Sequence, residues 1–96
     1  MYAIGIIRYR RALGEVMVHL DAHRAYLRGL NEKGVLLASG PCDSGLGGLL
    51  LLRVADGDLK ALDTVRDNDP FVQNGVAQYE MLGWVPVTGK EALDKL

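Results

Sequence analysis

A histidine occupies a position where helical periodicity predicts an apolar side chain. The stretch HLDAHRAYLRGL, residues 19–30, has the apolar spacing of an amphipathic helix. Three apolar residues lie within about 40° of His23 around the helix axis: Val16, Leu27 and Leu30. His23 is therefore expected in the buried stripe. There it either hydrogen-bonds a backbone carbonyl in a structural role, or acts as a general acid or base oriented by a carboxylate.

Other residue types suggest metal, thiol or phosphate chemistry less strongly. His19 lies one turn before His23, but the zinc motif of metalloproteases needs a glutamate directly after its first histidine, and Leu20 stands there. No further histidine or cysteine completes a ligand set, so we expect no metal and no other cofactor. Cys42 opens no helix and has no histidine near it in sequence, which favours a loop cysteine without a chemical role. The glycines of residues 44–48 lack the spacing of a phosphate-binding loop and lead into a strand.

Two aspartates and an arginine are further candidates for a site. Asp67 and Asp69, in DNDPF, are expected at the C-terminal end of a helix, where the helix dipole disfavours a carboxylate by a few tenths to about 1 kcal/mol. Such a position indicates either an ordinary turn before proline or a function. Arg8 alternates with Ile4 and Ile6 along a strand. It is therefore either solvated at the strand end or directed inward, toward an anionic group of a substrate.

Composition limits the possible partners. The 96 residues fit one domain, residues 1–96, with 49% hydrophobic residues and a net charge of -1 from 11 basic and 12 acidic side chains. This charge disfavours nucleic acids and anionic membranes, and leaves small molecules as the expected ligands. The longest apolar run is too short for a membrane span. The single cysteine, and an N-terminus whose charges follow its apolar run, predict a reducing cytoplasmic location.

The hydrophobic pattern predicts six elements in the order βαββαβ. A long helix runs from Glu15 to about Lys33, and a shorter one begins at Asp58 and is closed by Pro70. The tail adds a final helical turn. Strands are predicted over residues 2–9, 35–41, 47–55 and 75–87.

This order is typical of an α+β, ferredoxin-like fold with a four-stranded antiparallel sheet and both helices on one face. A sheet face open to water should carry alternating polar residues, yet residues 35–37 and 49–52 are apolar on both faces. The second face therefore needs a cover. In a chain this short we expect a second copy, giving a homodimer with its sheets packed face to face.

The chain resembles the YCII-related family, a branch of the dimeric α/β-barrel proteins, over nearly its whole length to Trp84. The matching segments are HRAYLRGL, LLASGP and NDPFVQNGVAQYEMLGW. His23 matches the family's histidine in the first helix, and Asp69 matches the aspartate of its DPF signature. The SGP motif, Ser39 to Pro41, matches the end of its second strand. The resemblance implies a dimer of ferredoxin-like protomers with a His-Asp pair in a pocket, and one branch of the family resembles a dehydrochlorinase of chlorinated hydroxyquinols.

The residues and the resemblance together predict proton-transfer chemistry without a cofactor. His23 acts as general acid or base on a small carbonyl-containing or hydroxylated aromatic compound, in an isomerisation or elimination, and Asp69 orients it. Substrate-binding roles are expected for five residues: Arg8, Ser39, Gly40, Pro41 and Phe71. The alternative is a dimer that binds a small ligand without turnover. RNA binding is disfavoured, because the third strand has no stacking aromatic residues.

Overall fold

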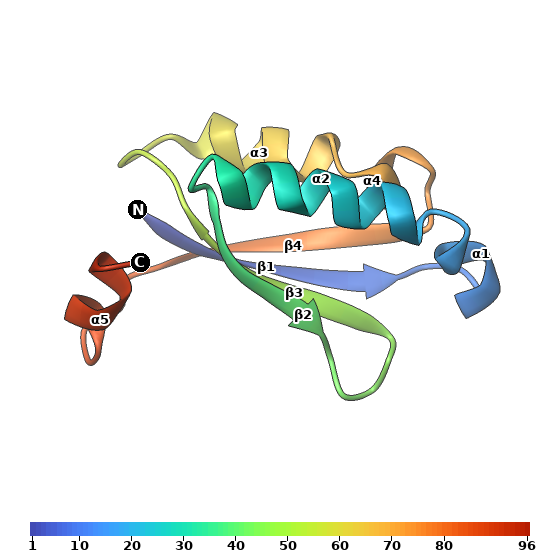
Figure 1. Ribbon diagram of the computed structural model, residues 1–96, viewed down its shortest axis with the longest axis horizontal. Helices are drawn as coiled ribbons and strands as arrows, with labels where there is room; N and C mark the ends of the chain where they lie inside the picture. Colours follow the sequence, from blue (N-terminus) through green and yellow to red (C-terminus); the bar gives the residue numbers. More distant parts are fainter.

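Four strands form an antiparallel sheet at the centre of the computed structural model, which describes residues 1–96 (Figure 1). The strand order is β2-β3-β1-β4, and each neighbouring pair is antiparallel. This is the ferredoxin-like arrangement that the sequence predicts. The strands are β1 (Tyr2–Tyr9), β2 (Leu36–Pro41), β3 (Gly47–Arg53) and β4 (Ala77–Trp84).

The first predicted helix is divided in two, and the second is followed by a short helix that the sequence did not predict. The first consists of α1 (Leu13–Met17) and α2 (Leu20–Glu32), separated where the N–H of His19 bonds the carbonyl of Val16, in a turn tighter than the α-helix. The second is α3 (Leu59–Asp67), and the unpredicted helix is α4 (Pro70–Gln73). Pro70 cannot continue α3 but suits the first position of a new helix.

The core lies between the helices and one face of the sheet. Figure 1 shows α2, α3 and α4 side by side over this face. The sheet contributes alternate residues, because successive side chains of a strand point to opposite faces. Twelve buried residues form this core: Ala3, Ile7, Leu36, Leu50, Leu52 and Ala77 from the sheet, and Val16, Leu30, Leu62, Val65, Phe71 and Val76 around them.

The opposite face of the sheet carries apolar side chains that no helix of the main layer covers. Leu49 and Leu82 are 47% and 44% exposed, and Trp84 is 38% exposed. Ile4 pairs with Leu82 on the neighbouring strand, so it shares this face. The two-sided apolarity that the sequence indicates is therefore present in the fold.

The predicted helical turn in the tail is α5 (Lys90–Asp94), and it lies on the side of the sheet away from α2 (Figure 1). The hydroxyl of Tyr2 donates to Oδ1 of Asp94 at 2.6 Å, and Arg53 donates to the carbonyl of Leu96 at 2.6 Å. These bonds hold the C-terminal segment at one end of the open face. None of the helices has the length and apolarity needed to cross a membrane.

Candidate active site

The histidine in the buried stripe meets a buried carboxylate. Nδ1 of His23 lies 2.8 Å from Oδ1 and 2.9 Å from Oδ2 of Asp69, across 46 residues of sequence. His23 is 8% exposed and Asp69 is not exposed at all. The contact brings α2 and the start of α4 together. A carboxylate of an adjacent element, and not a backbone carbonyl, therefore orients the imidazole.

The structure corrects the expected position of Asp69 relative to the helices. Asp69 does not end the second helix. It is the N-cap of α4, where its Oδ1 accepts a hydrogen bond from the backbone N–H of Phe71 at 2.9 Å. At a helix N-terminus the unpaired N–H groups favour a carboxylate. The electrostatic penalty expected at residue 69 is thus replaced by a favourable interaction, and the cause is the new helix that begins at Pro70.

A third donor binds the carboxylate, and the sequence analysis missed it. The hydroxyl of Tyr79, in β4, donates a hydrogen bond to Oδ2 of Asp69. Burial raises the pKa of Tyr79 far above its usual value, and the nearby charge of Asp69 raises it further. The hydroxyl therefore remains a donor. Its strand position held a signal, because Tyr79 alternates with the buried Ala77 and so faces the helices.

The hydrogen bonds of Asp69 determine which imidazole nitrogen carries the proton. A carboxylate only accepts hydrogen bonds, so Nδ1 of His23 must donate to it. The neutral imidazole then has its lone pair on Nε2. In this tautomer Nε2 can accept a proton, and the imidazolium that forms would be stabilised by the carboxylate behind it.

Aromatic packing holds the plane of the imidazole. The ring of Phe71 stacks on the ring of His23 with centroids 3.9 Å apart and planes 6° from parallel. Tyr9 packs edge-on against Phe71 at 5.8 Å. Phe71 is itself 1% exposed, so it has little freedom to move. The predicted site residue Phe71 thus contacts the imidazole directly.

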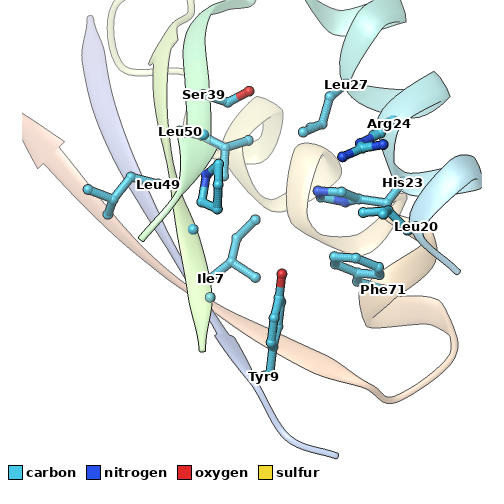
Figure 2. A pocket seen from close by; sticks show the side chains of 14 residues that line it. Ile7, Tyr9, Leu20, His23, Arg24, Leu27, Ser39, Leu49, Leu50 and Phe71 are labelled. Atoms are coloured by element: carbon cyan, nitrogen blue, oxygen red, sulfur yellow. The ribbon is translucent and has the colours of Figure 1, made fainter. Parts of the chain in front are cut away.

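A cavity of about 270 Å³ opens in front of the histidine. Figure 2 shows His23 and Phe71 on its helix side, the hydroxyl of Tyr9 at its base and Ser39 on the opposite wall. Asp69 is absent from the lining, because it lies behind the imidazole. The cavity is lined by Ile7, Tyr9, Leu20, His23, Arg24, Leu27, Ser39, Gly40, Pro41, Gly47, Gly48, Leu49, Leu50 and Phe71.

An irregularity in β2 directs the SGP motif toward this cavity. Leu36 pairs with Leu52 and Ser39 pairs with Leu50, so three residues of β2 advance while β3 advances by two. Such a bulge reverses the face on which the following side chains lie. Without it, Ser39 would share the open face of the sheet. With it, Ser39 and Pro41 lie on the helix side and line the cavity with Gly40.

Two glycines of β3 let the backbones approach closely beside the SGP motif. A Cβ atom on Gly47 would lie 1.9 Å from the carbonyl oxygen of Ile7, and one on Gly48 would lie 2.8 Å from that of Gly40. Both contacts involve backbone atoms, which cannot rotate away. The glycines interpreted as turn residues thus also form the floor of the cavity.

Arg8 is the predicted site residue that the structure does not bring to the cavity. It lies on the open face, where it forms an ion pair with Glu80 at 2.9 Å. The expectation that it points inward is wrong, because it shares its strand face with Ile4 and Ile6 and not with Ile7. The sequence analysis also missed Tyr9 and Arg24, which do line the cavity.

A comparison with protein families identifies the family of this chain. A model described as the YCII-related domain matches residues 1–85, which include every element from β1 to β4. The chain belongs to the YCII-related family. The resemblance inferred from the sequence motifs is therefore confirmed. In this YCII-related chain α5 lies beyond the matched residues. No curated protein matches the chain.

Among solved structures, the YCII-related chain is similar to a 5-chloro-2-hydroxyhydroquinone dehydrochlorinase from Burkholderia phenoliruptrix, solved with 2,5-dihydroxybenzoquinone. The two share 23% sequence identity over 92% of this chain and 97% of the other, with a TM-score of 0.70. At this identity the likeness shows a common fold.

Proposed function

We propose that this protein is an enzyme that catalyses proton transfer on a small molecule, in an isomerisation or an elimination, with His23 as general base and acid. One observation carries the proposal: Nδ1 of His23 binds a fully buried carboxylate while the same ring lines a cavity. A purely structural histidine needs the hydrogen bond to a buried partner, but it does not need a ring that lines a cavity.

In the proposed reaction, Nε2 of His23 removes a proton from a carbon or a hydroxyl group of the substrate. In an elimination, the electron pair of the broken C–H bond forms a C=C bond, and the leaving group departs with its own bonding pair. In an isomerisation, His23 returns the proton to another atom. Negative charge that develops on a substrate oxygen would be bound by the hydroxyls of Ser39 and Tyr9, which have no other hydrogen-bond partner in the protein.

The expected substrate is one hydroxylated or carbonyl-containing ring. A volume of about 270 Å³ suits a compound of that size. Leu20, Leu27 and Phe71 provide apolar contacts, while the polar side chains of the lining are few: Tyr9, His23, Arg24 and Ser39. The dehydrochlorinase of similar fold, solved with a dihydroxybenzoquinone, supports an aromatic substrate and favours the elimination.

A homodimer is part of the proposal, and the apolar open face supports it. Exposed leucines and a tryptophan on one continuous sheet face are unusual for a monomer. Packing two copies of this face together would bury Leu49, Leu82 and Trp84. The cavity lies on the helix side of the sheet, and of these three residues only Leu49 also belongs to its lining.

Matched histidine variants test the proposed function. A panel of hydroxylated and halogenated aromatic compounds is assayed with the wild-type chain, His23→Ala, Asp69→Asn and the double variant. Each single change should lower turnover by at least about 100-fold, and the double variant should be little worse than the worse single one, because the pair acts as a unit. His19→Ala is the control, since His19 is only half-buried and does not line the cavity.

Circular dichroism and thermal unfolding separate loss of chemistry from loss of fold. The proposal is wrong if folded His23→Ala turns over the substrate as fast as His19→Ala does. A wild-type chain that binds compounds of the panel without converting any of them would favour the ligand-binding alternative instead.

A further inference from the structure

Two arginines of α2 lie one turn apart without a carboxylate partner. Arg24 and Arg28 are both exposed, and neither forms an ion pair or a side-chain hydrogen bond within the protein. Asp21 and Glu32, one turn to either side, form no ion pair with them. Like charges at this spacing destabilise a helix slightly. Their side chains do not stabilise the helix, and both guanidinium groups are free to bind a ligand.

Both arginines line hollows that adjoin the candidate active site. Arg24 lines the catalytic cavity, and Figure 2 shows its guanidinium on the same side as His23 and Leu27. A second cavity, of about 280 Å³, lies between α2 and β2. It is lined by Arg24, Leu27, Arg28, Asn31, Leu36, Ala38 and Ser39. The two hollows share Arg24, Leu27 and Ser39, so they adjoin, and together they are called the cleft.

The cleft is positively charged. Its lining contains no aspartate, glutamate or lysine, and Asp69 is hidden behind the imidazole. The amide nitrogen of Asn31 donates one of its two hydrogens to the carbonyl of Leu36 at 2.8 Å. The hydroxyl of Ser39 is an unpaired neutral donor of the second cavity, and the two guanidinium groups are its unpaired charged donors. Guanidinium groups favour carboxylates and similar oxyanions, which they bind through paired N–H bonds.

We propose that the substrate carries an oxyanion, such as a carboxylate, which Arg24 and Arg28 bind in the second cavity while the reacting ring lies against His23. This inference rests on the proposed function for the position of the ring, and it adds the charge class of the substrate. Arg24 stands at the junction of the two cavities. It therefore determines how far the oxyanion lies from Nε2 of His23, and with it which atom of the substrate is presented to the base.

A matched pair of ligands tests the charge class without any turnover. The probes are 4-hydroxybenzoate and 4-hydroxybenzamide, which have nearly the same size but differ in charge. Isothermal titration of the full chain at low salt should show the benzoate binding at least about tenfold more tightly. Arg24→Gln should abolish this preference, and Arg28→Gln should reduce it. Arg24→Lys should retain part of it, because it keeps the charge and loses the paired geometry.

The control is Arg11→Gln, which changes the net charge equally but lies outside both cavities. It should leave the preference unchanged. The inference is overturned by equal affinities for the two probes, by no benzoate binding at millimolar concentration, or by an equal effect of Arg11→Gln.

A final variant distinguishes failure of this inference from failure of the proposed function. His23→Ala removes the proposed base, and it also removes another group that carries positive charge when protonated. A benzoate preference that persists in this variant and still depends on Arg24 supports the oxyanion site, whether or not the wild-type chain shows turnover. A preference that disappears with His23 assigns the anion to the imidazole and overturns the role of the arginines.

Discussion

Two tyrosine hydroxyls near Asp69 give the protein a predictable limit at alkaline pH. Burial, together with the charge of Asp69, raises the pKa of Tyr26 to about 12 and raises that of Tyr79 further. In the unfolded chain tyrosine loses its proton near pH 10. The stability that these protonated hydroxyls contribute is therefore complete below about pH 10 and is lost progressively at higher pH.

The test of this prediction is denaturant unfolding at a series of pH values from 8 upward. The free energy of unfolding of the wild-type chain should fall above about pH 10. Tyr79→Phe should flatten this fall, and Tyr26→Phe should flatten it less. At pH 8 Tyr26→Phe should lose about 1 kcal/mol, for one hydrogen bond to a carbonyl, and Tyr79→Phe about 1.5–3 kcal/mol, because its bond is to a carboxylate. Identical alkaline slopes in all three proteins would contradict the assignment.

The sequence predicted the residues of the proposed pair more fully than it predicted their surroundings. Helical periodicity placed His23 on the buried stripe, and the DPF motif supplied Asp69. The local reasoning about Asp69 was wrong, because a single proline can both end one helix and start another. Tyr79 and Arg24 were missed because their roles depend on contacts between elements distant in sequence. Periodicity within one element carries no information on such contacts.

At the scale of elements, Gly47 decides how closely β3 can approach β1. Its absent Cβ would lie 1.9 Å from the carbonyl oxygen of Ile7, so Gly47→Ala must push the strands apart. We expect a loss of more than about 2 kcal/mol in the free energy of unfolding. Gly29→Ala is the matched control, because no atom lies within 4 Å of its Cβ position in α2.

The control should change stability in the opposite direction, by a gain of about 0.5–1 kcal/mol, because alanine restricts the unfolded chain and favours helix. Urea unfolding of both variants measures the difference. A Gly47→Ala chain as stable as the wild type would mean that the strands can separate at little cost.

The sequence predicted which segments form strands and which form helices, but not where a bulge or a break interrupts them. The bounds predicted for β1 agree with the structure, because its aromatic and β-branched residues are followed at once by charged ones. The bulge in β2 was not predicted. It becomes visible only in the pairing of Leu36 and Ser39 with their partners on β3. The division between α1 and α2 was also missed, since the apolar stripe continues across it.

At the scale of the whole molecule, the open sheet face predicts self-association. We expect sedimentation of the wild-type chain at micromolar concentration to give the mass of a dimer. Leu49→Glu and Leu82→Glu should each shift it toward monomer, because each would place a carboxylate in the contact. Val18→Glu should not, although Val18 is 77% exposed, because it lies outside the sheet. A wild-type monomer, or equal effects of all three changes, would rule out this interface.

The three donors that meet on Asp69 also bear on how such a protein diverges during evolution. They come from α2, α4 and β4, so one carboxylate joins three elements of the fold. Loss of Asp69 would leave buried donors unpaired and so lower the free energy of unfolding. Selection for folding alone would therefore oppose this loss. A descendant that no longer turns over substrate would therefore keep the His23–Asp69 pair. New specificities would instead arise at the cleft lining, where Arg24 or Ser39 can change without disturbing the core.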